Sequence, residues 1–391
     1  MLSLRRSLVS LGLLVALVPL GAIPACSSSD PAPASSSSGG ADAGTSPDGA
    51  TTGDATTGDG GSNKGEPIAA PEGKWTFVDF PDSACDDGTP TGIGIYPNKA
   101  SDKLLVFLNG GGACWDYGTC VTFNTSTHGP IGSKQFANAS AAFGGSVMDH
   151  ALADNPFKDY STVWIPYCTG DVHTGDTVNT YGDGGGKTAQ IHHKGHANVL
   201  AYLKRLVPTF SKPGKIVISG SSAGGGGALF NYPTFREAWP GVPMMLVEDS
   251  LPLFVGNSIT PTLRKAWFDS WKLDAVAGPI CPGCKDDLSL FMKAVAEKYP
   301  QDRLALLSSQ QDRTIRTYFQ LQPAAFQTAL EQLTTDVLDK QPNWRHFYVT
   351  GETHTMLGSP DKFTAGTTPL WPWLSQLTND ATPPASADPG K

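Results

Sequence analysis

Short apolar runs and longer amphipathic segments alternate along residues 67–379. The apolar runs are rich in Val, Ile and Leu and predict buried strands at residues 104–108, 162–167, 215–219, 243–247, 304–307 and 346–350. Other segments place apolar residues three and four positions apart and predict helices at residues 196–206, 287–299 and 324–338. This alternation is typical of βαβ units, so the predicted fold class is α/β, with a mostly parallel sheet covered by helices on both faces. In such a sheet, reacting groups lie at the carboxyl ends of the strands.

Two segments rich in turn-forming residues interrupt this alternation, at residues 129–145 and 181–187. Glycine recurs in both segments and is typical of turns. We therefore expect both to be long surface insertions into the α/β pattern.

The first 25 residues have the pattern of an export signal. Arg5 and Arg6 precede an apolar run over residues 8–20. This run is shorter than the roughly 20 apolar residues that a membrane-spanning helix needs. The sequence Ile-Pro-Ala-Cys that ends at Cys26 resembles the bacterial lipobox, in which the signal is cleaved before the cysteine and the cysteine is acylated. The prediction is a lipoprotein-type signal over residues 1–25 and a lipid-anchored, extracytoplasmic protein of the bacterial cell envelope. Ordinary secretion is the alternative.

Composition divides the rest of the 391-residue chain into three parts. Residues 26–66 are almost wholly Ser, Gly, Ala, Asp and Thr, which predicts a disordered tether after the lipidated cysteine. Residues 67–379 are long enough for one large domain with a single core. Residues 380–391 contain three prolines and are predicted to form a flexible tail.

The formal net charge is −8 at pH 7. An acidic chain provides no basic field to attract a polyanion, so nucleic acid is not expected as a partner. Contact with a membrane is expected only through the N-terminal lipid.

Six cysteines lie in the part predicted to fold: Cys85, Cys114, Cys120, Cys168, Cys281 and Cys284. An even number in an exported domain suggests three disulfides. Proximity in sequence favours Cys114 with Cys120 and Cys281 with Cys284, which leaves Cys85 with Cys168, one of about 15 possible connectivities. The Cys-Pro-Gly-Cys run at 281–284 has the spacing of a thioredoxin-like redox pair, but no strand leads into it, so a structural disulfide is favoured.

A Gly- and Ser-rich turn follows the third predicted strand, in the sequence KIVISGSSAGGGGALF. A serine on a tight turn from strand to helix needs small residues two positions before and two positions after it. Ser222 has Gly220 and Gly224 at these positions, whereas Ser221 would need a glycine where Ser219 stands. Ser222 is therefore the candidate nucleophile, and the alternative is a turn without chemistry.

A serine nucleophile needs a base, an acid that holds the base, and donors for the developing oxyanion. In α/β-hydrolases the chain order is Ser, Asp or Glu, then His, each just after a strand. His354 lies downstream of Ser222 and just past the last predicted strand, whereas His346 falls within that strand. His354 is the predicted base.

Two carboxylates compete for the role of the acid. Asp312 follows the penultimate predicted strand, where this fold usually carries its acid, and is favoured. Asp249 follows the preceding strand and is the alternative, together with its neighbour Glu248.

Three glycines directly follow the first predicted strand, in the sequence LVFLNGGGACWD. Glycines allow backbone N–H groups to point into a site with no Cβ in the way. The predicted oxyanion donors are the amides of Gly111 or Gly112 together with that of Ala223.

Two other patterns suggest chemistry but lack its requirements. Residues 181–188 resemble a phosphate-binding loop, yet Tyr181 stands where the first glycine is required, so no nucleotide is expected. His192, His193 and His196 lie close together, but no acidic residue completes a HExxH pattern, so no metal site is predicted.

Four stretches resemble the pectin acetylesterase and Notum carboxylesterase family, in the family's order: CDDGTPTGI at 85–93, FLNGGGACWDYGTC at 107–120, YCTGDVHTGD at 167–176 and IVISGSSAGGGGALFN at 216–231. The likeness continues through residues 244–254 and covers roughly half of the predicted domain. It implies an α/β-hydrolase-like fold, no metal or other cofactor, and removal of acyl groups from oxygen. One branch of the family removes acetate from pectin, and the other removes a fatty acyl group from a lipid-modified protein.

Carried over by position, the resemblance implies Ser222 as nucleophile, Asp312 as acid, His354 as base, and Gly111, Gly112 and Ala223 at the oxyanion hole. Two positions depart from the family's pattern, because Asn109 stands where Glu commonly precedes the glycines and Ala113 stands where Trp follows them. The likeness thins beyond about residue 257, so Asp312 and His354 rest mainly on chain order and strand context.

These observations predict an extracytoplasmic serine carboxylesterase that hydrolyses O-acyl esters through an acyl-enzyme on Ser222. The substrate implied by the resemblance is an acetylated polysaccharide such as pectin. One alternative is a lipase-like or polyester-depolymerase-like hydrolase of longer acyl chains, for which Ala113 would leave room. Another is a non-catalytic, surface carbohydrate-binding protein on a hydrolase fold. Trp267 and Trp271 are candidates to line a substrate site, with burial in the core as the alternative.

Overall fold

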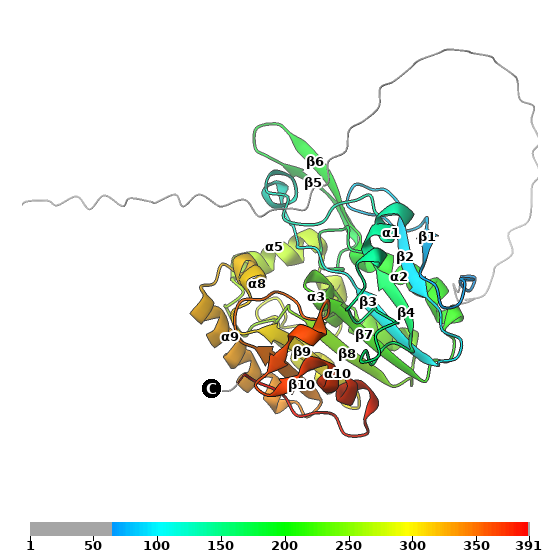
Figure 1. The fold of residues 1–391 in the computed structure, drawn as a ribbon. Coiled ribbons are helices and arrows are strands. Elements are labelled where there is room, and N and C mark those ends of the chain that lie inside the picture. The colour runs from blue at the N-terminus through cyan, green and yellow to red at the C-terminus, as the bar shows by residue number, and fades with distance from the viewer. Residues whose placement is uncertain (1–64, 390–391) are drawn as a thin grey trace, which may run out of the picture. The chain divides into compact units, whose positions relative to one another are not determined.

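The computed structural model describes residues 65–389. The predicted signal, Cys26 and all of the predicted tether before residue 65 lie outside the described residues, so the predictions made for them stay predictions. The described residues belong to a single unit (Figure 1).

The centre of this unit is an eight-stranded sheet with strand order β1-β2-β4-β3-β7-β8-β9-β10. Its strands are β1 (Thr76–Phe80), β2 (Thr91–Tyr96), β3 (Lys103–Leu108), β4 (Ser161–Ile165), β7 (Lys215–Ser221), β8 (Met244–Asp249), β9 (Arg303–Ser309) and β10 (Trp344–Val349). The six strands predicted from apolar runs are all present and pair in parallel with one another. Only β1 and β2, at one edge, pair antiparallel.

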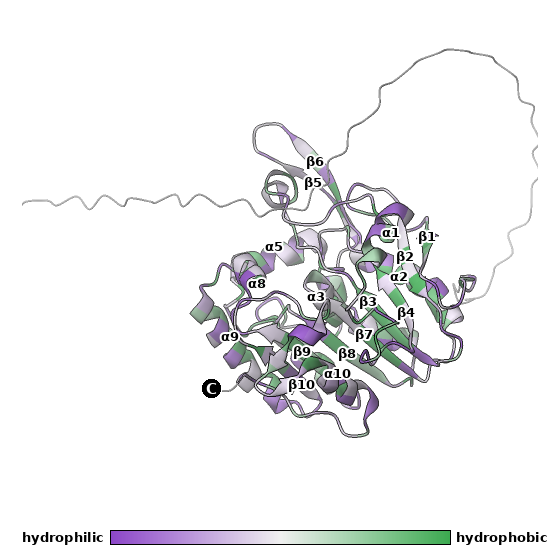
Figure 2. Cartoon of the chain, viewed as in Figure 1, coloured by the Kyte–Doolittle hydropathy of each residue, from purple (hydrophilic) through white to green (hydrophobic). Residues whose placement is uncertain are grey.

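Helices cover both faces of the sheet, as predicted. The longer helices are α1 (Ser133–Ala141), α2 (Gly195–Thr209), α3 (Ala223–Phe230), α5 (Pro261–Trp271), α7 (Ser289–Lys298), α9 (Pro323–Asp336) and α10 (Leu370–Asn379). Shorter elements are α4 (Tyr232–Ala238), α6 (Asp274–Ala277), α8 (Arg313–Tyr318), η1 (Gly118–Thr122), η2 (Leu338–Lys340) and η3 (Pro360–Lys362). One core packs α2, α3, α5, α7 and α9 on one face of the sheet, and a second packs α1 and α10 on the other. Figure 2 shows hydrophobic residues along the central strands and hydrophilic residues on the outer helices. The fold is α/β-hydrolase-like.

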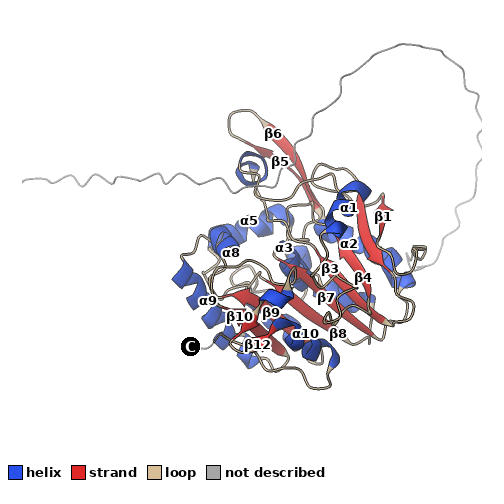
Figure 3. Ribbon diagram, viewed as in Figure 1, coloured by secondary structure: helices blue, strands red, loops and turns tan. Residues whose placement is uncertain are grey.

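The two predicted insertions contain regular structure. The segment 129–145 carries helix α1, so this insertion is not a loop throughout. The segment 181–187 forms the tip of a hairpin of β5 (Thr177–Gly182) and β6 (Thr188–His193), which projects from the rest of the unit (Figure 3).

The expectation of a flexible tail from residue 380 is also wrong for residues 380–389. Ala387 forms a bridge with Phe347 of β10, and its main chain exchanges two hydrogen bonds of 2.9 Å with His346 and Tyr348. The indole N–H of Trp373 donates to the carbonyl of Ala385 at 2.8 Å. The tail therefore packs along the last strand of the sheet, at an edge that would otherwise expose unpaired backbone groups.

Trp267 and Trp271 are buried, with exposed fractions of 2% and 0%. Their rings stack 5.1 Å apart, and the Trp271 indole donates to the carbonyl of Cys114 at 2.9 Å. Both are core residues, so the suggestion that they line a substrate site is wrong. Among residues 65–389, no helix combines the length and the apolar character that crossing a bilayer requires.

Candidate active site

Ser222 lies between the end of β7 and the start of α3, in a strained conformation with φ 59° and ψ −128°. A Cβ on Gly220 would collide with the carbonyl of Gly224, and a Cβ on Gly224 would collide with the carbonyl of Leu108. Both flanking positions therefore require glycine, because a side chain at either position would clash at the bend, as predicted from the sequence. The resulting turn directs Ser222 to the carboxyl end of the sheet.

The two adjacent serines have different surroundings. The hydroxyl of Ser221 donates to Asp249 Oδ2 at 2.8 Å. The amide of Ser222 donates to the Asp249 carbonyl at 2.7 Å, whereas its hydroxyl has no hydrogen-bond partner among residues 65–389. Of the two, Ser222 has the free hydroxyl.

His354 and Asp312 are brought together from the loops after β10 and β9. His354 Nδ1 lies 2.8 Å from Asp312 Oδ2. Asp312 is fully buried, and its Oδ1 accepts the amides of Thr314 and Ile315 at 2.9 Å, which makes it the N-cap of α8. Both oxygens of Asp312 are thus used, and its orientation is fixed. No hydrogen bond joins Ser222 to His354 within the described unit. Hydrogen bonds between catalytic groups are often long or poorly aligned until a substrate binds.

Asp249, the alternative acid, does not contact the imidazole through a hydrogen bond in this part of the chain. Its Oδ2 accepts the amides of Met356 and Leu357, two and three residues after His354, at 2.8 and 2.9 Å. Burial raises the pKa of the Asp249 carboxyl, and these hydrogen bonds oppose the rise.

Glu248, the other alternative, lies on the opposite side of β8 from Asp249, because side chains alternate along a strand. It is fully buried, and neither carboxylate oxygen has a partner among the described residues. Burial raises its pKa well above the usual range, and the neighbouring Asp249 adds to the rise. Burial therefore favours the protonated, neutral form of Glu248.

The glycine loop after β3 lies against Ser222. A Cβ on Gly110 would lie 2.9 Å from the Ser222 Cβ, so only glycine allows this approach. The amides of Gly111 and Gly112 make no hydrogen bond within residues 65–389, and Gly112 has φ 77°. The Ala223 amide lies in the first turn of α3, where N–H groups have no intrahelical acceptor. The role of these three amides as oxyanion donors stays a prediction, and the lack of acceptors within the described residues is compatible with it.

Sequence reasoning missed two side chains that hold this glycine loop. His173 Nε2 lies 2.9 Å from the carbonyl of Asn109, and burial lowers the pKa of His173, which favours a neutral ring that donates from Nε2. Tyr318 of α8 donates its hydroxyl to the carbonyl of Thr125, beside Gly112. His173 stands within a stretch that carries the family resemblance and could have been singled out, whereas nothing in the sequence pairs Tyr318 with the glycine loop.

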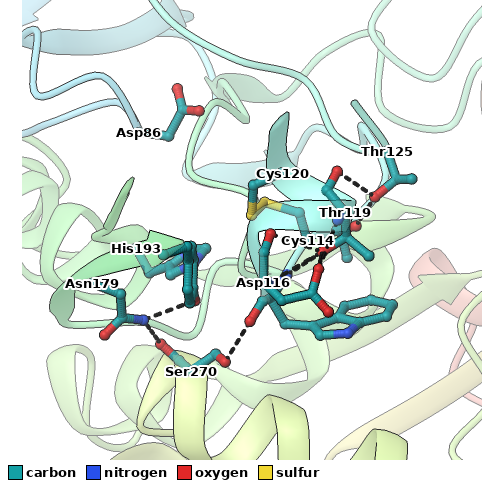
Figure 4. The surroundings of a disulfide bond; sticks show 12 residues. Asp86, Cys114, Asp116, Thr119, Cys120, Thr125, Asn179, His193 and Ser270 are labelled. Atoms are coloured by element: carbon teal, nitrogen blue, oxygen red, sulfur yellow. Dashed lines mark hydrogen bonds between the residues drawn. A yellow bond between two sulfur atoms is a disulfide. The ribbon is translucent and has the colours of Figure 1, made fainter. Parts of the chain in front are cut away.

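A disulfide between Cys114 and Cys120 closes the loop that follows the glycines (Figure 4). The other two pairs are Cys85 with Cys168 and Cys281 with Cys284. These are the pairs that proximity in sequence favoured.

The imidazole of His193 lies near the sulfurs of Cys114 and Cys120. Because these sulfurs are bonded to each other, no thiolate is free to bind a metal. His193 Nδ1 instead lies 2.8 Å from the Thr169 carbonyl, and His196 Nδ1 lies 2.7 Å from Asn231 Oδ1. The glycines after Tyr181 form a hairpin tip without a following helix, which a phosphate-binding loop requires.

A cavity of about 670 Å³ lies at the opposite end of the sheet. Its lining includes Lys103 at the start of β3 and Ser161 at the start of β4, and none of the candidate catalytic residues. The cavity therefore lies apart from the candidate active site.

Comparison with known proteins places these residues in a family context. The pectinacetylesterase family model matches residues 71–295, a range that contains Ser222, Gly111, Gly112 and Ala223 but neither Asp312 nor His354. The chain is 31% identical over 165 residues to palmitoleoyl-protein carboxylesterase NOTUM of Schmidtea mediterranea, covering 40% of this chain and 30% of that protein. It is 29% identical over 149 residues to notum2 of Xenopus laevis, covering 38% of this chain and 29% of that protein.

A third relative is the inactive palmitoleoyl-protein carboxylesterase notum1b of Danio rerio, 32% identical over 115 residues. That match covers 29% of this chain and 76% of the relative. The chain therefore spans less than a third of the first two relatives and most of the third.

Proposed function

Because the chain belongs to the pectinacetylesterase family, we propose that it is an extracytoplasmic serine carboxylesterase with Ser222, His354 and Asp312 as its catalytic residues. The observation that carries the proposal is the convergence of three parts at the carboxyl end of one sheet. These are the free hydroxyl of Ser222 on a strained turn, the hydrogen-bonded pair of His354 and Asp312, and a glycine loop with free amides.

In the proposed reaction, Ser222 Oγ attacks the ester carbonyl while His354 Nε2 takes its proton. Asp312 holds the imidazole by Nδ1 and stabilises the imidazolium that forms. The amides of Gly111 or Gly112 and of Ala223 stabilise the oxyanion of the tetrahedral intermediate. His354 then gives its proton to the leaving alcohol, and water hydrolyses the acyl-enzyme by the same steps in reverse.

The proposed substrate is an O-acetylated polysaccharide such as pectin. It is supported by the description of the family whose model the chain matches. The proposed site of action is the outside of a bacterial cell, with the protein anchored through a lipid on Cys26 or secreted. Three disulfides in the described unit support an oxidising, extracytoplasmic location.

A second candidate function is hydrolysis of a longer acyl chain, since two matched relatives are described as palmitoleoyl-protein carboxylesterases. A third is carbohydrate binding without turnover, since another relative is described as inactive. The Asp312–His354 pair argues against the third, because a binding protein has no need of an imidazole held by a buried carboxylate.

The test is hydrolysis of p-nitrophenyl acetate, butyrate and palmitate by the purified protein, beside its Ser222→Ala and Ser221→Ala variants. We expect rapid acetate hydrolysis that Ser222→Ala lowers by about 10⁶-fold and that Ser221→Ala lowers by no more than about threefold. Faster turnover of palmitate would favour the long-chain hydrolase. A folded wild type that neither turns over an ester nor reacts with an organophosphonate at Ser222 would leave only the binding protein.

A further inference from the structure

Asp249, the last residue of β8, contacts both halves of the proposed catalytic centre without being part of it. Its main-chain carbonyl accepts the amide of Ser222 at 2.7 Å. Its Oδ2 accepts three hydrogen bonds, from the Ser221 hydroxyl at 2.8 Å and from the amides of Met356 and Leu357 at 2.8 and 2.9 Å.

The remaining oxygen, Oδ1, accepts the hydroxyl of Ser250 at 2.9 Å. Asp249 is fully buried, so water does not compete for these contacts. A buried carboxylate with four donors is rigid, because rotating it would break several charge-assisted hydrogen bonds at once.

The segment that carries His354 needs such an anchor. Residues 350–359 have no helix or strand, and Thr355 has φ 65°, a conformation that costs free energy for a β-branched residue. On the near side of His354, the carbonyls of Gly351 and Glu352 accept the amides of Gln311 and Arg313, beside Asp312. On its far side, Asp249 holds the next main-chain amides.

We propose that Asp249 is a positioning residue that sets the distance between Ser222 and His354. One carboxylate holds the residue before the nucleophile and the loop after the base, so the two reacting groups share one rigid support. This inference rests on the proposed function, because it assigns Asp249 a part in the same reaction.

Glu248 provides a matched control on the same strand. It is equally buried, but it faces the other side of β8, and neither carboxylate oxygen has a partner in the described unit. Asp249→Asn and Glu248→Gln each replace a buried carboxyl group by its isosteric carboxamide. Only Asp249→Asn weakens the contacts to Ser221 and to the His354 loop.

The experiment measures kcat and KM for p-nitrophenyl acetate, the rate of phosphonate reaction with Ser222, and the thermal unfolding of wild type and both variants. We expect Asp249→Asn to lower kcat and the phosphonate rate by about 10²-fold, with KM within about twofold, because small misplacements of a base cost that much. Glu248→Gln should keep kcat within about twofold. Hydrogen exchange of residues 350–359 should accelerate in Asp249→Asn alone.

Each outcome supports or overturns the positioning role of Asp249. A folded Asp249→Asn with wild-type kcat, or a fall in kcat that Glu248→Gln matches, would overturn the positioning role while leaving the esterase intact. If Asp249→Asn does not fold, Ser221→Ala decides: a kcat loss of about threefold at unchanged KM supports the role, and an unchanged kcat overturns it. An inactive, unlabelled wild type would overturn the proposed function, and the positioning role with it.

Discussion

Replacing Asp312 with Asn tests which carboxylate holds the proposed base. Asp312 uses Oδ2 for His354 and Oδ1 for the amides of Thr314 and Ile315. A carboxamide has one oxygen and one NH₂ group, and two amide donors favour the oxygen on their side. The NH₂ group then faces His354 Nδ1 and stabilises the tautomer that carries its proton on Nε2. That nitrogen must be free to accept the proton of Ser222.

The expected loss of activity is therefore large, whereas the loss of stability is small. With the wrong tautomer, we expect kcat to fall about 10⁴-fold, which corresponds to about 5 kcal/mol of transition-state stabilisation. KM should stay within about twofold, because Asp312 is buried and does not reach the substrate. Since Asn also caps helices, the free energy of unfolding should change by less than about 1 kcal/mol.

The assay is steady-state hydrolysis of p-nitrophenyl acetate, with urea unfolding of the same preparations. Asp249→Asn serves as the comparison, and its expected loss is only about 10²-fold. The reverse ranking, in which Asp312→Asn retains activity within about tenfold while Asp249→Asn loses about 10⁴-fold, would assign the acid to Asp249 and refute the reasoning.

Two further predictions concern residues that surround the site. The raised pKa of Glu248 lets the folded state hold a proton that the unfolded state releases. As pH rises above about 4.3, the free energy of unfolding of wild type should therefore fall relative to that of Glu248→Gln, by up to about 1.4 kcal/mol per pH unit. Thermal unfolding of both proteins at pH 4, 6 and 8 checks this, and a constant difference contradicts it. Gly224→Ala should lower kcat by about 10²-fold and the unfolding free energy by about 1–3 kcal/mol, because its Cβ collides with the Leu108 carbonyl. Gly144→Ala, with nothing within 4 Å, should change neither in the same assays.

Sequence reasoning succeeded where the residues that determine a local structure all lie within one short segment of the chain. Gly220 in the turn at Ser222 is an example, because a Cβ there would collide with the carbonyl of Gly224 in the same turn. The buried parallel strands are another, since their apolar runs need no partner to be recognised.

It failed where the requirement comes from a distant part of the chain. Strand β2 was missed because Gly92 and Gly94 lower its strand propensity, and both are needed for contacts made elsewhere. A Cβ on Gly92 would collide with the Val78 carbonyl of β1, and one on Gly94 would collide with the ring of Phe136. The tail was missed for a similar reason, since its prolines suggested disorder although an extended chain can still pair at an open sheet edge.

The two carboxylates at the end of β8 show why the candidate site could be predicted only in part. Glu248 and Asp249 are neighbours in sequence, both end in a carboxyl group, both are fully buried, and both follow a predicted strand. Strand alternation sends one into the core and the other towards the loop after His354, but sequence alone does not say which residue faces which side. That loop is more than 100 residues away, and only its return supplies the amides that give Asp249 its partners. Glycine spacing and chain order suffice to propose a nucleophile and a base, whereas the positioning role proposed for Asp249 depends on contacts that only the folded chain makes.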